Sequence, residues 1–163
     1  MKLKHLSIIL AMLMSCFISV SIKAQQKTNI IKEGVGIENL TVGKSNKKDV
    51  EKKFGKDYKW TANKNYSYQM IYPNGVSFYI CQADKRQEIF DIEIRSPYQA
   101  KTSRGITLRK STLDDVRKIY GTAKKGLRYR GIEFYYRKSG GKDVVTVIDV
   151  VEKTGLRQCT ENK

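Results

Sequence analysis

The sequence predicts an α+β fold in which two tandem units, each strand–helix–strand–strand–strand, form one antiparallel sheet with short helices on one face. Three repeated features support this prediction. They are a helix-like segment, "SNKKDVEKKFG" (45–55) and "STLDDVRKIYG" (111–121); a strand-like segment after a glycine, "NGVSFYI" (74–80) and "RGIEFYY" (130–136); and a closing strand, "EIFDIEIRS" (88–96) and "DVVTVIDVVEK" (143–153). A small helix cannot bury its apolar face alone, so two copies are expected to share a core.

Each copy is expected to open with a short strand, "LTVGKS" (40–45) or "ITLRKS" (106–111), that leads into the helix. In the second copy Ser111 is the predicted N-cap, and Asp114 three residues later completes a capping box. Gly121 is expected to end this helix in the left-handed conformation.

The first helix keeps the apolar pair Val50 and Phe54 at i, i+4 spacing, but it has Lys48 where the second copy has Asp114. It is therefore predicted to be the weaker helix. Its lysines are interpreted as a solvated face. The first copy also carries ten extra residues between helix and strand, within 56–69.

Successive side chains of a strand point to opposite faces of the sheet, so the sequence of the later strands predicts which side chains lie on each face. The side chains expected to point inward are Val76, Phe78, Ile80, Phe90, Ile92, Ile94, Ile132, Phe134 and Tyr136. Those expected to point outward are Ser77, Tyr79, Cys81, Asp91, Glu93, Arg95, Glu133, Tyr135 and Arg137. If both helices cover the inward face, the outward face stays open.

The first 24 residues have the pattern of a secretory signal peptide that is cleaved after Ala24. Two alternatives are an uncleaved membrane anchor, for which the apolar run is short of about 20 residues, and lipidation at Cys16. Export predicts a periplasmic or secreted bacterial protein with no membrane span after leader removal. The predicted divisions are a signal peptide 1–24, an N-terminal extension 25–35, repeat 1 36–96, a linker 97–104, repeat 2 105–153 and a polar tail 154–163.

The chain is strongly basic, with 32 Lys and Arg against 16 Asp and Glu. Loss of Lys2, Lys4 and Lys23 with the leader would leave 29 basic residues against the same 16 acidic ones, a formal charge of +13. Outside the cytoplasm this charge favours an acidic protein, an anionic envelope polymer or phosphorylated lipid headgroups as partner, rather than nucleic acid. The alternative is that the lysines serve only solubility.

Residue usage argues against an enzyme. The single histidine, His5, lies in the leader, so the exported chain has no histidine for a catalytic triad or a zinc site, and it has no P-loop or GxGxxG motif. No cofactor and no metal are predicted. A carboxylate-dependent hydrolase stays a minor alternative that would require two carboxylates facing each other in a closed pocket.

Two cysteines remain after leader removal, Cys81 and Cys159. An oxidising compartment favours a disulfide between them, which would close a loop of 78 residues. The alternative is a pair of free thiols.

Aromatic and arginine side chains on the open face are the candidate binding residues, because protein interfaces favour them over lysine. Tyr79, Tyr135 and Arg137 are predicted on the strands. Nearby loop candidates are Trp60, Tyr66, Tyr68, Arg128 and Arg130. Two alternatives stay open: the tyrosines pack across the sheet simply as good strand residues, and Trp60 plugs an edge of the core.

The segments "GKSNKKDVEKKFG" with "NGVSFYI", and "RKSTLDDVRKIYG" with "RGIEFYY", resemble the tandem domains of the β-lactamase-inhibitor-protein group and the small outer-membrane-assembly lipoproteins related to it. The resemblance covers most of residues 36–153. It implies a tandem-repeat α/β architecture whose exposed concave sheet binds protein.

Together these features predict an exported, non-enzymatic protein-binding module of the inhibitor, immunity or envelope-assembly type. The alternative is a binder of anionic envelope polymer or lipid headgroups through the basic surface.

Overall fold

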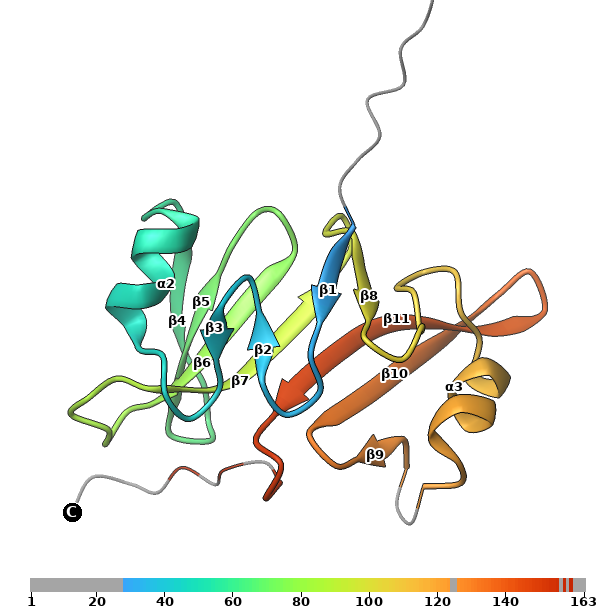
Figure 1. Ribbon diagram of the computed structural model, residues 1–163. Helices are drawn as coiled ribbons and strands as arrows, with labels where there is room; N and C mark the ends of the chain where they lie inside the picture. Colours follow the sequence, from blue (N-terminus) through green and yellow to red (C-terminus); the bar gives the residue numbers. More distant parts are fainter. Residues whose placement is uncertain (1–27, 124–125, 156, 158, 160–163) are drawn as a thin grey trace, which may run out of the picture.

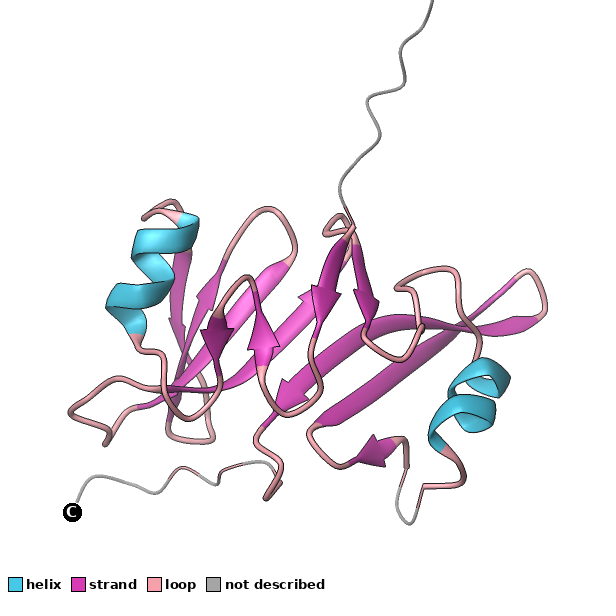
Figure 2. Ribbon diagram, viewed as in Figure 1, coloured by secondary structure: helices cyan, strands magenta, loops and turns pink. Residues whose placement is uncertain are grey.

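The computed structural model describes residues 28–123, 126–155, 157 and 159. The predicted leader, its cleavage after Ala24 and Cys16 lie outside the described residues. The predicted α+β fold is confirmed: a seven-stranded antiparallel sheet is accompanied by two helices and two small two-stranded sheets (Figure 1; Figure 2).

The large sheet contains strands from both copies, in the spatial order β4-β5-β6-β7-β11-β10-β9. Its strands are β4 (Lys59–Ala62), β5 (Ser67–Ile71), β6 (Val76–Cys81), β7 (Ile89–Arg95), β9 (Arg128–Tyr129), β10 (Ile132–Ser139) and β11 (Lys142–Val151). The other elements are β1 (Asn29–Ile31), β2 (Gly36–Ile37), β3 (Leu40–Thr41), α2 (Lys47–Phe54), β8 (Ala100–Thr102) and α3 (Leu113–Tyr120).

The two copies meet at β7 and β11. These strands are equivalent in the two copies, and they pair antiparallel, with Glu93 directly opposite Asp149. The two residues also occupy the same position in the repeat, 56 residues apart. An approximate twofold axis therefore passes through the sheet between them, and the hairpins β6–β7 and β10–β11 lie on either side of it.

A layer of helices and short strand pairs covers one face of the large sheet. The helices α2 and α3, the pair β1–β8 and the pair β2–β3 all lie on that face (Figure 1). Equivalent aromatic contacts attach the two helices, with the Phe54 ring 5.2 Å from Phe78 and the Tyr120 ring 5.1 Å from Phe134 between ring centroids. The core lies between this layer and the sheet, as the buried Val50 and Val116 indicate.

Both helices begin one residue later than predicted. Asn46 and Thr112 are the N-caps, and Asp49 and Asp115 complete the two capping boxes. The predicted cap Ser111 instead accepts a hydrogen bond from the Thr107 amide in the turn before the helix, at 3.0 Å. The reason for predicting a weaker first helix is therefore wrong, because Asp49 and Asp115 fill the acidic position of the capping box in both copies.

The predicted opening strands are largely turns. Within 40–45 only Leu40–Thr41 is a strand, and 106–111 has a single bridge, between Lys101 and Thr107. In contrast, the ten-residue insertion forms an additional strand, β4, which pairs with β5 and widens the sheet. The first copy therefore has one more strand than predicted.

The predicted extension and linker contain a parallel strand pair, β1 with β8. Ile31 and Ala100 in this pair are buried in the core. Burial of these side chains explains why the two segments are part of the fold, although neither has enough residues to show a periodic pattern.

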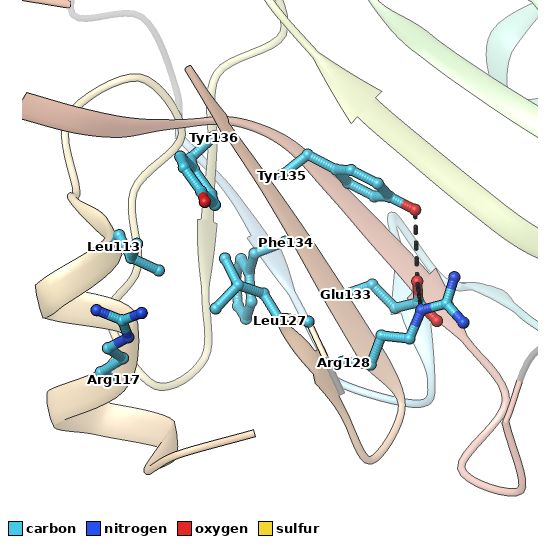
Figure 3. A pocket seen from close by; sticks show the side chains of 9 residues that line it. Leu113, Arg117, Leu127, Arg128, Glu133, Phe134, Tyr135 and Tyr136 are labelled. Atoms are coloured by element: carbon cyan, nitrogen blue, oxygen red, sulfur yellow. Dashed lines mark hydrogen bonds and ion pairs between the residues drawn. The ribbon is translucent and has the colours of Figure 1, made fainter. Parts of the chain in front are cut away.

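One β-bulge changes the predicted inward set. Tyr79 pairs with Asp91 but Ile80 pairs with Ile89, so Phe90 is the extra residue. Ile89 takes its place in the core, and the Phe90 ring lies 6.3 Å from the Tyr79 ring on the other face. Tyr136, also predicted inward, lies on the α3 side but remains 46% exposed (Figure 3).

Gly131→Ala is expected to lower the free energy of unfolding by about 2 kcal/mol. Gly131 has φ 83°, and a Cβ there would lie 2.5 Å from the backbone nitrogen and Cα of Gly34. Gly140→Ala is the control, because Gly140 also has a positive φ but open space around it. Urea unfolding of both variants measures the difference, and equal losses would show that the close approach of Gly34 has no effect.

Candidate functional site on the open sheet face

The face of the large sheet opposite the helices carries a cluster of acidic side chains at its centre. Asp91 and Glu93 come from β7, Asp149 from β11 and Glu133 from β10. Alternation places all four on this face, since their strand neighbours Ile92, Ile94, Ile148, Val150 and Ile132 are in the core. A quarter of the 16 acidic residues of a basic chain thus gather at one place.

The two glutamates of this cluster have cationic and phenolic partners. Arg95 donates two hydrogen bonds to Glu93, at 2.5 and 2.7 Å, and Arg128 lies 3.0 Å from Glu133. The hydroxyls of Tyr79 and Tyr135 also donate, to Glu93 at 3.3 Å and to Glu133 at 3.4 Å (Figure 3 shows the second). The charge of each glutamate is therefore compensated within the sheet.

The two aspartates have no such compensation. Asp91 and Asp149 are each 8% exposed, and the Oδ1 atom of each is buried without a hydrogen-bond partner. Neither forms an ion pair with any residue that the structure describes. Burial raises the pKa of both carboxyls well above the usual range, and their mutual repulsion together with that of Glu93 and Glu133 adds to the rise.

A cavity of about 580 Å³ lies over the aspartates. Its lining includes polar and charged side chains, Lys64 and Arg157 among them, and aromatic side chains from both copies and from the β4–β5 loop, namely Tyr66, Tyr79, Phe90 and Tyr135. A second hollow of about 350 Å³ shares Glu93, Tyr135 and Asp149 with the first and extends to Arg137. The two hollows form a groove across the junction of the copies.

The predicted polar tail borders one end of this groove. The Cα atoms of Cys81 and Cys159 are 5.3 Å apart, and their sulfur atoms are at disulfide-bonding distance. Arg157 also lines the cavity and is held by Glu152 through a 2.7 Å hydrogen bond. The tail is thus attached to the open side of β6.

Residues 22–149 match the family described as a domain of unknown function (DUF4309). The chain belongs to this family. The match covers repeat 1 and repeat 2 as far as residue 149, and so it includes the four carboxylates on the open face of this chain. No curated protein and no solved structure matches the chain.

The structure of this DUF4309 chain brings together five of the eight predicted binding residues. Tyr66, Tyr79 and Tyr135 line the larger hollow, Arg137 lines the smaller one, and Arg128 pairs with Glu133. The open face therefore gathers residues that are as far apart in the sequence as 66 and 137.

The other three predicted residues lie elsewhere. Trp60 and Tyr68 are on the helix side of the sheet, with ring centroids 4.8 Å apart and the Lys47 ammonium 4.8 Å from the centre of the indole. Arg130 is exposed in the turn between β9 and β10. Trp60 lies on the edge strand β4 but is 36% exposed, so it does not plug the core as the alternative interpretation expected.

Sequence reasoning placed Asp91, Glu93 and Glu133 on the outward face but did not identify them as a site. Their proximity depends on the β7–β11 pairing, which no local pattern encodes. Phe90 was missed because a bulge reverses its direction. The equivalence of Glu93 and Asp149 in the repeat was the available signal.

The described part of the chain has no group of three or more histidine, cysteine or acidic side chains arranged to hold a metal ion. Neither of its helices is long and apolar enough to cross a membrane.

Proposed function

We propose that this chain is an exported, non-enzymatic binding module that holds another protein against the open face of its sheet. The observation that carries this proposal is the groove at the junction of the two copies, which combines exposed aromatic rings with two buried aspartate Oδ1 atoms that have no hydrogen-bond partner. The inhibitor, immunity and envelope-assembly types all fit such a surface. The resemblance of the repeats to the β-lactamase-inhibitor-protein group supports the same face.

The tyrosines on this face suit recognition because they are fixed before any partner arrives. Gln69 donates to the Tyr79 hydroxyl at 2.7 Å, and that hydroxyl donates to Glu93. Tyr135 is held by Glu133 while 45% of its surface stays exposed. Ordered aromatic side chains lose little entropy on binding and often dominate interface energies.

We favour binding over a carboxylate-dependent hydrolase, because the groove is open. Tyr66 and Tyr135, which border it, are 40% and 45% exposed, so the described residues leave the aspartates in an open groove rather than a closed pocket.

The alternative function, binding of anionic envelope polymer or lipid headgroups, would use a different surface. The lysines of α2 lie on the helix side, and the centre of the open face is acidic. A polyanion is therefore expected to bind away from the groove, and the two functions can be separated by variants on the two faces.

The test is affinity capture with the chain from Gln25 to Lys163, exposed to envelope and secreted fractions of the native cell at low and moderate salt. The double variant Tyr79→Ala/Tyr135→Ala is expected to weaken retention of the partner by at least about tenfold. Tyr68→Ala is the matched control, because Tyr68 lies on the opposite face of the same sheet. Melting temperatures confirm that each variant is folded.

A single protein retained at both salts by the wild type and the control, and lost with the double variant, supports the proposed function. Capture of lipid or glycan only at low salt, unaffected by the tyrosines, supports the alternative function and contradicts the first.

A further inference from the structure

The carboxylates at the centre of the open face outnumber the cations that pair with them. Arg95 compensates Glu93, and Arg128 compensates Glu133. Two further cations line the cavity: Lys64, which forms no ion pair with any described residue, and Arg157, which is held by Glu152 at 2.7 Å and lies 3.8 Å from Asp84 and from Glu88. Within the described residues, neither Asp91 nor Asp149 forms an ion pair with a cation.

The two aspartates are placed to share one ligand. Asp149 pairs with Glu93, and Val151, two residues further along β11, pairs with Asp91, so the aspartates are diagonal neighbours on the same face of β7 and β11. Carboxyl groups at such positions can approach one bound group from two sides. Both border the 580 Å³ cavity, and both have a buried Oδ1 atom with no partner.

The walls of the cavity match an alkyl chain that ends in a positive charge. Tyr79, Phe90 and Tyr135 present aromatic surface next to the carboxylates. Aromatic rings pack against the methylene stem of a lysine and attract its ammonium group. An ammonium with three donors can bond to two carboxylates at once, and in this desolvated site its charge would compensate theirs.

We propose that the protein partner inserts a lysine side chain into the groove, where Asp91 and Asp149 bind its ammonium group between the rings of Tyr79, Phe90 and Tyr135. This inference rests on the proposed function, since it specifies what the partner presents to the open face.

The first experiment uses Nα-acetyl-lysine methylamide as the probe, titrated into the chain from Gln25 to Lys163 and followed by amide chemical shifts. The probe is expected to bind with a Kd in the millimolar range and to shift resonances of β7 and β11. The norleucine analogue, which lacks the ammonium, is expected to bind at least tenfold more weakly. Equal binding of the two probes would overturn the inference.

Asp91→Asn/Asp149→Asn is expected to weaken lysine-probe binding at least tenfold while the fold is retained, because the amides keep the shape and remove the charge. Asp143→Asn is the matched control, an aspartate on the same strand that does not line the cavity. Melting temperatures and the chemical shifts of β4 and β5 report folding. Unchanged binding by a folded double variant would contradict the inference.

Binding of the probe is also expected to release protons and to weaken as the pH falls from 9 to 6. The ammonium binds the ionised carboxylates, whereas burial favours their protonated form. The charged and titratable groups around the pair and along the cavity are Glu93, Glu133, Tyr66, Tyr79, Tyr135, Lys64, Arg95 and Arg157. The variant Asp91→Asn/Asp149→Asn separates the contribution of the two aspartates from that of these other groups. If probe binding by this variant still depended on pH, the dependence would come from groups other than the aspartates.

Capture of the natural partner distinguishes failure of this inference from failure of the proposed function. A partner that is lost with the tyrosine double variant but fully retained by Asp91→Asn/Asp149→Asn would overturn lysine insertion and leave the open face as the binding surface. A partner retained by both variants would overturn the proposed function itself.

Discussion

Replacing Cys81 and Cys159 with serine is expected to lower the free energy of unfolding by about 4 kcal/mol. The cysteines are 78 residues apart, and a cross-link over that length removes much of the freedom of the unfolded chain. The bond also fixes Cys159 in the segment after β11 (Lys142–Val151), where Arg157 bonds to Glu152 and lies 3.8 Å from Asp84 and from Glu88 between β6 and β7. Urea unfolding of the oxidised wild type and the double variant measures the loss.

Reduction of the wild-type protein provides the control, since it should reproduce the stability of the double variant. Thiol titration of the purified, oxidised protein tests the bond directly. Two reactive thiols, together with equal stability of wild type and variant, would show that the cysteines are close but not bonded. Loss of the bond is also expected to open the end of the groove that Cys159 borders.

The sheet was predictable because its signal is local and occurs twice. Alternation in Val76, Phe78 and Ile80 identifies a buried face within six residues, and all three are in the core. The same pattern at Ile132 and Phe134 confirms the repeat. Two helices with equivalent apolar residues then place the covering layer on one side, which leaves the other side open.

Features that depend on distant partners could not be predicted in this way. The parallel pair β1–β8 joins Ile31 to Thr102, and neither short segment shows an alternating pattern. The bulge at Phe90 depends on the register between β6 and β7, which alternation along a single strand does not report. The helix caps differ from prediction by one residue, because serine and its neighbour are both good capping residues.

The candidate site was predicted in its aromatic residues and missed in its charge. Tyr79 and Tyr135 were identified from their equivalent positions in the two copies. The four acidic residues Asp91, Glu93, Glu133 and Asp149 come together only when β7 pairs with β11. The burial that raises the pKa of the two aspartates depends on the complete sheet. A basic composition pointed to an anionic partner, whereas the centre of the open face is acidic.

This acidic centre destabilises the folded protein unless something compensates it. Like charges opposite each other across a strand pair are unfavourable, and Glu93 opposes Asp149 directly. Buried carboxylates without partners add a desolvation penalty. A fold that retains this arrangement at the junction of its two copies is consistent with a ligand that supplies the missing positive charge.

Stability is therefore expected to fall as the pH rises from about 4 through neutrality, with a loss on the order of 2–4 kcal/mol by pH 9. The pKa values of Asp91 and Asp149 are raised in the folded state, so both carboxyls bind protons more tightly there than in the unfolded chain. Their contribution is fully favourable below the unfolded pKa of about 3.9 and is lost as the pH passes through the raised values. Urea unfolding across this range measures the slope.

Asp91→Asn/Asp149→Asn is expected to remove most of this slope and to make the protein more stable than wild type at pH 9, since the amides cannot ionise. Groups with lowered pKa values, such as Glu33 and Asp115, act in the opposite direction and reduce stability only at lower pH. An unchanged slope in the double variant would show that the pair does not govern the alkaline loss. A variant that gains stability while losing the lysine probe would indicate that the aspartates serve binding at the expense of the fold.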